Sequence, residues 1–230
     1  MKVTILKKDI HEFRSVGLLL TFIGGAVDLY TYTHYESFAS AQTGNLVLGI
    51  TQLLNGEWSS AGKKLLAVCF FFLGVLTGKF MIRYFQMKEW PFWRLIILYV
   101  EAFLFLIIGL HSVNQHTGFV TLSIAFVTAA QWISFDKING RAYTSLFTTG
   151  NLKGLAASLY DYLATREKNA FDGFIHYLLV VFAFIFGALF SAIGYRYFHE
   201  KSILLVAGLF FYLAITQTIL VLKFYRSDYE

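Results

Sequence analysis

The sequence predicts an all-α integral membrane protein whose six transmembrane helices form two inverted three-helix repeats. Three observations lead to this prediction. The chain of 230 residues is 57% hydrophobic and only 14% charged, whereas soluble domains carry about 25% charged residues. Its apolar residues gather in runs of roughly 20, the length that a helix needs to cross a bilayer. The tripeptide Thr-Gly-Asn also occurs twice, at residues 43–45 and 149–151, each time after such a run.

Six apolar runs are long enough to be spanning helices. They cover Val16–Tyr35, Leu65–Phe85, Phe92–Leu110, Gly118–Phe135, Phe174–Tyr197 and Ile203–Leu222. The first run contains polar residues where a signal peptide would need small residues for cleavage, so we expect it to be retained. Almost no sequence is left for a soluble domain, and we therefore treat residues 1–230 as a single membrane domain.

The positions of lysine and arginine orient these helices. If the N-terminus is cytoplasmic, fifteen of the 19 lysines and arginines lie inside and four lie outside. The inner set is Lys2, Lys7, Lys8, Arg14, Lys79, Arg83, Lys88, Arg94, Lys137, Arg141, Lys153, Arg166, Lys168, Lys223 and Arg226, and the outer set is Lys63, Lys64, Arg196 and Lys201. Positive residues favour the cytoplasmic side, which predicts that both termini are cytoplasmic.

An alternative count treats the segments after each Thr-Gly-Asn as further spans. This gives eight helices, with ten positive residues inside, eight outside and Lys153 in the membrane. The weaker asymmetry makes six spans the better prediction. The net charge of +5 then reflects how the helices are oriented in the lipid bilayer. We therefore expect no nucleic-acid partner.

Two halves of the chain align with each other. Residues 43–46 match residues 149–152 at an offset of 106, and Gly74 and residues 83–85 match Gly187 and residues 196–198 at an offset of 113. Repeat one covers about residues 14–112 and repeat two about residues 117–225. Each has three crossings, an odd number, so the second half enters from the opposite face and the repeats are inverted. Duplication kept only for folding is the other interpretation.

The segments that follow the paired motifs are expected to be short helices. Leucines at residues 152, 155, 159 and 163 recur at helical spacing, which indicates an amphipathic helix. It either lies at the cytoplasmic interface, which we favour, or re-enters the bundle. The corresponding segment Leu46–Leu54 has no charge and is suited to a deeper position. Small residues at 74 and 78 and at 187 and 191 predict close helix packing, within the bundle or in a homodimer.

Two carboxylates in the apolar runs are candidates for proton coupling, because ionisable groups within a membrane are costly and usually functional. Asp28 lies about 18 Å into the first run and Glu101 about 14 Å into the third, at 1.5 Å per residue. We expect them to face a common cavity, where one would hold a proton. The alternative for Asp28 is structural: it caps a helix broken at Gly24-Gly25, or it pairs with Lys79.

The paired motifs are the candidate substrate site, since matched helix breaks mark binding sites in transporters. We expect Gly44 and Gly150 to form turns, and the neighbouring Thr43, Asn45, Thr149 and Asn151 to cap the helices that follow. Free N–H groups at such helix starts favour a polar or anionic ligand. Gln42 and Gln131 are further candidates for binding substrate. Simple helix capping is nearly as good an interpretation.

Enzymatic and cofactor signatures are missing from the sequence. It contains no phosphate-binding loop, dinucleotide fingerprint, metalloprotease motif or nucleophile elbow. The single cysteine, Cys69, pairs with no histidine or cysteine at metal-ligand spacing. We expect a non-enzyme with no cofactor and no metal.

The chain resembles the YoaK-like family of bacterial six-span membrane proteins, which is named for a domain of unknown function. The run Gly-Gly-Ala-Val-Asp at residues 24–28, the run from Phe38 to Asn45, Gln131 and the second Thr-Gly-Asn carry the resemblance. It implies the six-span fold and the bacterial plasma membrane. Ala41 and Trp132 stand where many members have asparagine, so the ligand is expected to differ. The repeat plan is also similar to half of a major facilitator superfamily transporter, by topology alone.

These observations predict a small secondary transporter. A polar or anionic small molecule would bind between the repeats, with Asp28 and Glu101 as the proton-coupling candidates. Half-size transporters often act in pairs, so a homodimer is plausible. The main alternative is a membrane scaffold or lipid sensor that transports nothing. A membrane enzyme acting on lipid ranks last, because the sequence shows no nucleophile or metal cluster.

Overall fold

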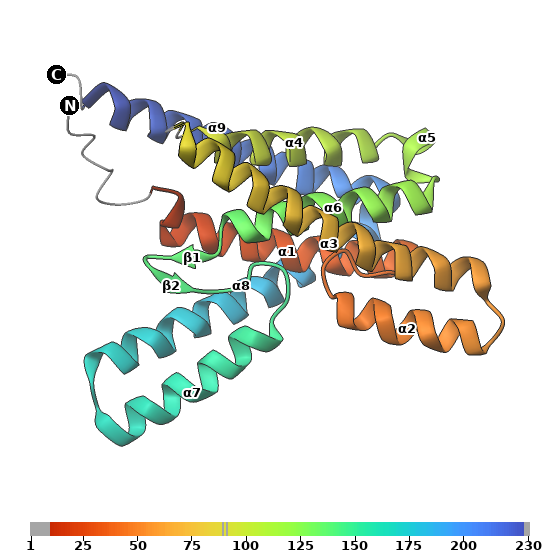
Figure 1. The fold of residues 1–230 in the computed structure, drawn as a ribbon. Coiled ribbons are helices and arrows are strands. Elements are labelled where there is room, and N and C mark those ends of the chain that lie inside the picture. The colour runs from red at the N-terminus through yellow and green to blue at the C-terminus, as the bar shows by residue number, and fades with distance from the viewer. Residues whose placement is uncertain (1–9, 89, 91, 228–230) are drawn as a thin grey trace.

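The chain folds into an elongated bundle of helices with one small hairpin (Figure 1). The computed structural model describes residues 10–88, 90 and 92–227. Lys2, Lys7, Lys8 and Pro91 lie outside the described residues. The long helices are α1 (Arg14–Tyr35), α3 (Trp58–Met87), α4 (Trp93–Ile108), α6 (Thr117–Ser134), α8 (Lys168–Phe198) and α9 (Ile203–Ser227). Each helix covers one of the six predicted apolar runs, and at most two residues at either end of a run fall outside its helix. The all-helical prediction is therefore confirmed.

Shorter elements connect the long helices. They are η1 (Ile10–Glu12), α2 (Gln42–Leu54), α5 (His111–Asn114), β1 (Lys137–Ile138), β2 (Arg141–Ala142), α7 (Thr149–Thr165) and η2 (His199–Ser202). The two strands form an antiparallel hairpin in which Lys137 pairs with Ala142. Helices α2 and α7 are the short helices predicted after the two Thr-Gly-Asn motifs.

Most of the long helices are apolar enough and long enough to cross a membrane. Within the described residues, four stretches are long and apolar enough to cross a bilayer: Arg14–Tyr35, Trp58–Met87, Thr117–Ser134 and Lys168–Phe224. The last of these includes both α8 and α9, joined by η2. Helix α4 has 16 residues, fewer than the roughly 20 that usually span the hydrocarbon. The surface of α3 carries large apolar side chains such as Phe72 and Phe80, as a face against lipid does.

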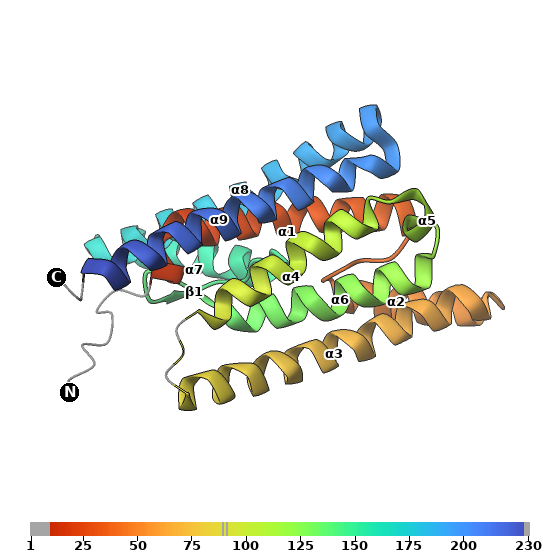
Figure 2. The ribbon, with the colours of Figure 1, turned by 90° about the horizontal axis from the view of Figure 1, so that it is seen from above.

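The helices of the two halves pair in a matching pattern. Helix α1 packs along α8, and α3 packs along α6. Helix α2 lies against α3, and α7 lies against α8. Helices α4 and α9 pack on each other (Figure 2), with the rings of Phe105 and Phe210 stacked at 5.3 Å.

Glycines allow the long helices to approach closely. A Cβ on Gly187 of α8 would lie 1.8 Å from the carbonyl oxygen of Phe22 in α1, and one on Gly25 would lie 2.1 Å from that of Phe184. Likewise, a Cβ on Gly74 of α3 would lie 2.2 Å from the carbonyl oxygen of Phe126. The prediction that Gly74 and Gly187 pack helices within the bundle is confirmed.

Two predicted breaks in the helices are wrong. Helix α1 continues without interruption through Gly24 and Gly25, because these glycines serve close packing. The Thr-Gly-Asn motifs are also not turns: α2 begins at Gln42 and α7 at Thr149, so each motif lies in the first helical turn. Gly44 and Gly150 do not adopt positive φ, and no side chain caps either helix.

Candidate functional site

The segment that follows α1 folds back along that helix. The hydroxyl of Thr31 accepts a hydrogen bond from the Ala39 amide at 3.0 Å. Asp28 accepts one from the Ser40 amide at 2.9 Å. Asp28 lies seven residues before the end of α1, which is about 10 Å along the axis. Helix α2 therefore starts well below the end of α1 and runs back toward it.

The segment before α7 approaches the same point from the other end of α1. A Cβ on Gly17 would meet the side chain of Ile138, and one on Gly24 would lie 2.0 Å from the carbonyl oxygen of Ser145. The chain between these contacts therefore runs along α1 toward Asp28. Figure 1 shows the result: α2 and α7 begin near the middle of the molecule and run toward opposite ends.

Asp28, Ser40 and Leu146 meet where the two segments converge. The Ser40 hydroxyl lies 2.7 Å from the second carboxylate oxygen of Asp28 and 2.7 Å from the carbonyl oxygen of Leu146. All three residues are buried. We call this cluster the central junction. Asp28 bonds the Ser40 hydroxyl and the backbone amides of residues 39–41. Its contacts are therefore not a pair with Lys79, and α1 has no break for it to cap.

Asn45 and Asn151 hold the two converging segments by the same pattern of bonds. The side-chain oxygen of Asn45 accepts from the Phe38 amide at 2.9 Å, and its amide group donates to the Phe38 carbonyl at 2.8 Å. Asn151 makes the equivalent pair with the amide and carbonyl of Thr144, at 3.1 and 2.7 Å. Both asparagines are buried. These bonds go to the protein's own backbone, and Asn45 also bonds the side chains of Ser37 and Gln42. Both asparagines are therefore explained by contacts within the protein, without a ligand.

The other predicted substrate residues are not gathered at one place. Gln42 bonds within its own segment, to the Ala39 carbonyl and the Asn45 side chain. Thr43 and Thr149 are exposed. Gly44 lies against the ring of Phe38, and Gly150 is exposed with open space above it.

Gln131 and Glu101 are buried polar groups of a different kind. Gln131 of α6 is 1% exposed, and its side-chain oxygen has no hydrogen-bond partner among the described residues. Glu101 of α4 is completely buried, and neither of its carboxylate oxygens has such a partner. No described hydrogen bond joins Glu101 to Asp28. The expectation that these two carboxylates share a cavity therefore has no contact in the structure to support it.

Two pockets open at the end of the bundle that carries α5 and η2, which we call the α5 end. The first has a volume of about 310 Å³ and is lined by Thr33, His34, Tyr35, Glu36, Ser37, Ser60, Lys63, Lys64, Thr117 and Thr121. The second, of about 370 Å³, is lined by His34, Tyr195, Phe198, His199, Glu200 and Lys201. Neither is lined by any of the predicted substrate or proton-coupling residues.

Sequence reasoning missed the residues that form these features. Ser40 is a small polar residue in a loop, and only the folded chain brings it to Asp28 and Leu146. The sequence argument used Lys63 and Lys64 only as charges that orient the helices. Two adjacent lysines at the start of an apolar run were the signal that could have pointed to this pocket. No group of histidine, cysteine and acidic side chains suited to a metal occurs among the described residues.

Comparison with known proteins identifies the family. Residues 16–216 match the model of a family described as "Protein of unknown function (DUF1275)". Searches of curated proteins and of solved structures found no match. The matched region runs from α1 into α9 and includes the central junction, and the YoaK-like resemblance falls within this family. The chain therefore belongs to the DUF1275 family of proteins of unknown function.

Proposed function

We propose that the protein is a six-span secondary transporter of the bacterial plasma membrane, built from inverted repeats, that moves a polar or anionic small molecule past the central junction. The observation that carries this proposal is the meeting of two converging segments at Asp28, Ser40 and Leu146. Half-length helices that start near the midplane and run to opposite faces are typical of transporters. Irregular backbone at membrane depth is tolerated where protein buries it or where it lines a cavity.

The helix lengths support the re-entrant arrangement. Helix α2 has 13 residues and α7 has 17, so they extend about 20 and 25 Å at 1.5 Å per residue. A span of the hydrocarbon core needs about 30 Å. Helix α4, with 16 residues, is as short as α7, so the starting points of α2 and α7, which lie beside the middle of α1, carry the inference. We infer that each of these two segments enters and leaves on the same side, which gives six spans rather than eight. The matching contacts of α1 with α8 and of α3 with α6 support the inverted relationship.

The hydrogen bonds of the central junction suggest how a proton would be coupled to movement. A hydroxyl has a single proton, so Ser40 donates either to Asp28 or to Leu146. When Asp28 is protonated, it donates to Ser40 and Ser40 donates to Leu146, which joins the two segments. When Asp28 is ionised, Ser40 turns its proton to the carboxylate and the Leu146 carbonyl loses its donor. Proton release then separates the two halves at this point.

Transport is tested in proteoliposomes that contain a pH-sensitive dye. A panel of small carboxylates, phosphate esters and neutral sugars is applied as inward gradients. We expect one class to enter with a change in internal pH. Asp28→Asn should abolish the pH change, because the amide permanently donates to Ser40. Asp161→Asn, at an exposed position on α7, is the matched control. If no solute enters, or if Asp28→Asn behaves as wild type, the transporter proposal fails and a lipid-sensing scaffold becomes the better one.

The six-span arrangement has its own test in whole cells. Single cysteines at Ser59 and Asn169, in a background with Cys69 replaced by serine, are treated with a membrane-impermeant maleimide. Both positions are exposed. If α2 re-enters, position 59 is extracellular and reacts, while position 169 is protected. If α2 and α7 instead both cross the membrane, as in the eight-span alternative, both positions are cytoplasmic and neither reacts.

A further inference from the structure

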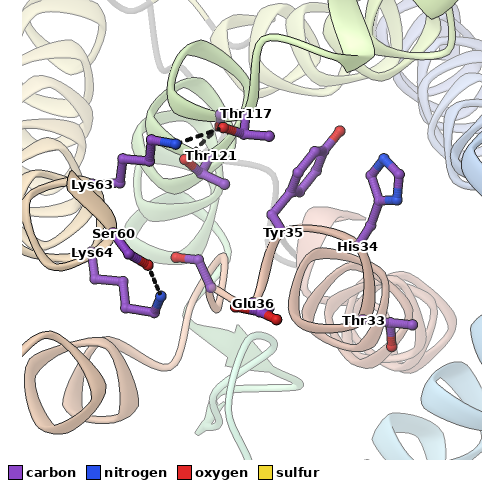
Figure 3. Close-up of a pocket in the computed structure, with 10 residues that line it drawn as sticks. Thr33, His34, Tyr35, Glu36, Ser60, Lys63, Lys64, Thr117 and Thr121 are labelled. Carbon is purple, nitrogen blue, oxygen red and sulfur yellow. Dashed lines mark hydrogen bonds between the residues drawn. The ribbon is translucent and has the colours of Figure 1, made fainter. Parts of the chain in front are cut away.

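We propose that the first pocket at the α5 end is a binding site for a phosphate group, held by Lys63 and Lys64. The pocket lies between the end of α1 and the first turns of α3 and α6 (Figure 3). None of its residues belongs to the central junction. The proposal concerns binding alone, so it stands whether or not the protein transports a solute.

Lys64 is the main reason for proposing an anion. The residue is only 2% exposed, yet it lines the pocket. Its ammonium group donates to the Ser60 hydroxyl at 3.1 Å. No other hydrogen bond and no ion pair of this ammonium occurs among the described residues. An ammonium has three donors, and burying a charge is costly unless it is paired. The unused donors of Lys64 therefore call for an acceptor that bears negative charge.

Three further donors surround the same space. Lys63 donates to the Thr117 hydroxyl at 3.2 Å, and its side chain is exposed. The hydroxyls of Ser60 and Thr117 each accept from a lysine, and neither donates in a described hydrogen bond. Each hydroxyl therefore keeps its own proton for a ligand. Figure 3 shows the two lysines reaching these hydroxyls, with Tyr35 and Glu36 across the pocket.

The charges of the pocket leave it positive. Two lysines and one glutamate, Glu36, line it, together with His34. Glu36 and Glu57 attract Lys64 electrostatically, but neither forms an ion pair with it among the described residues. Donors from α3 and α6 approach from different directions, which suits the tetrahedral oxygens of phosphate, and lysine binds phosphate as a point charge. The volume of about 310 Å³ lies at the lower end of the range for small-molecule sites.

The phosphate has two sources, a soluble phosphate compound and a lipid headgroup, and one experiment separates them. Purified protein is held in micelles of dodecyl maltoside, a detergent without phosphate, and its thermal midpoint is followed as sodium phosphate replaces sodium chloride at constant ionic strength and pH. A second series adds anionic phosphatidylglycerol to the same micelles, without soluble phosphate. A ligand that binds the folded state raises the midpoint in a saturable manner.

We expect a saturable rise with inorganic phosphate, with phosphatidylglycerol, or with both, and the arm that responds names the source. Lys64→Met should weaken the response by about tenfold or more, as expected for the loss of a charged hydrogen bond. Its midpoint without ligand should not fall, because it removes a buried charge that has no ionic partner. Lys63→Met should weaken the response as well, and it decides the matter if Lys64→Met does not fold.

Lys153→Met is the control, because this lysine is exposed on α7 and does not line the pocket. It should respond as wild type does. The proposal is overturned if neither phosphate nor phosphatidylglycerol stabilises the protein more than chloride in the detergent alone does. It is equally overturned if Lys63→Met and Lys64→Met both keep the full response.

Discussion

The Ser40 hydroxyl and the Leu146 carbonyl oxygen lie 2.7 Å apart, although 106 positions separate them in the chain. This offset is the one at which the two Thr-Gly-Asn motifs align. Residues in corresponding positions of the two halves therefore touch each other. In an arrangement with internal two-fold symmetry, such a contact lies on the axis. Asp28 supplies the third member of the cluster, and in the proposed transport cycle its protonation would decide which acceptor receives the Ser40 proton.

Asp28→Asn and Asp28→Ala should differ in stability. Asparagine retains an oxygen that accepts from the Ser40 amide and gains a donor for the Ser40 hydroxyl, so the thermal midpoint should stay near that of wild type. Alanine removes both bonds to Ser40 and should lower the free energy of unfolding by about 2–4 kcal/mol. Thermal unfolding in detergent measures both. Equal losses in the two variants would show that these bonds do not hold the loop.

Asn45→Ala and Asn151→Ala should destabilise the protein by similar amounts. Each removal leaves a part-buried backbone amide and carbonyl without their partner, at a cost of roughly 2–4 kcal/mol. Because the two asparagines hold separate segments, the losses should add in the double variant. Chemical denaturation of the three variants in detergent gives the comparison. Gln115→Ala, at an exposed position, is the control. A harmless substitution at either asparagine would contradict the structural role assigned to that residue.

Gly187→Ala should weaken the contact between α8 and α1. Its Cβ would lie 1.8 Å from the carbonyl oxygen of Phe22, so the helices must move apart, at a cost of about 1–3 kcal/mol. Gly208→Ala in α9 is the matched control, because its Cβ would meet nothing within 4 Å. In a helix, the control should be neutral or should gain up to about 1 kcal/mol. Thermal unfolding of the two variants decides, and a stable Gly187→Ala protein would argue against close packing here.

Glu101→Leu should stabilise the folded protein. The carboxyl group is completely buried and its oxygens have no hydrogen-bond partner among the described residues. Replacing such a group with an apolar one removes a desolvation cost of about 1–3 kcal/mol. Thermal midpoints of Glu101→Leu and the near-isosteric Glu101→Gln provide the measurement. A stable variant that has lost proton-coupled flux would assign Glu101 a functional role, whereas a drop in stability would reveal a structural partner.

The sequence alone determined where the helices lie. The predicted runs Val16–Tyr35 and Ile203–Leu222, for example, correspond to α1 and α9 within a few residues. Runs of about 20 apolar residues leave few other conformations, since backbone polar groups in a membrane must bond within their own segment. The leucine spacing after Thr149 likewise indicated α7, and the glycine pairs predicted close helix packing. These features are local, so a pattern along the chain is enough to reveal them.

Only the tertiary structure decided what the paired motifs and the buried carboxylates contact. A local argument placed a turn at Gly44, whereas the helix begins at Gln42 and Asn45 reaches back to Phe38. The helical rise along each apolar run gave Asp28 and Glu101 comparable depths, yet Asp28 bonds Ser40 while Glu101 has no partner among the described residues. The first pocket at the α5 end, which contains Lys63 and Lys64, draws its groups from α1, α3 and α6. Such contacts depend on how a loop folds back and which helices pair, and these are set by packing between segments that are far apart in the chain.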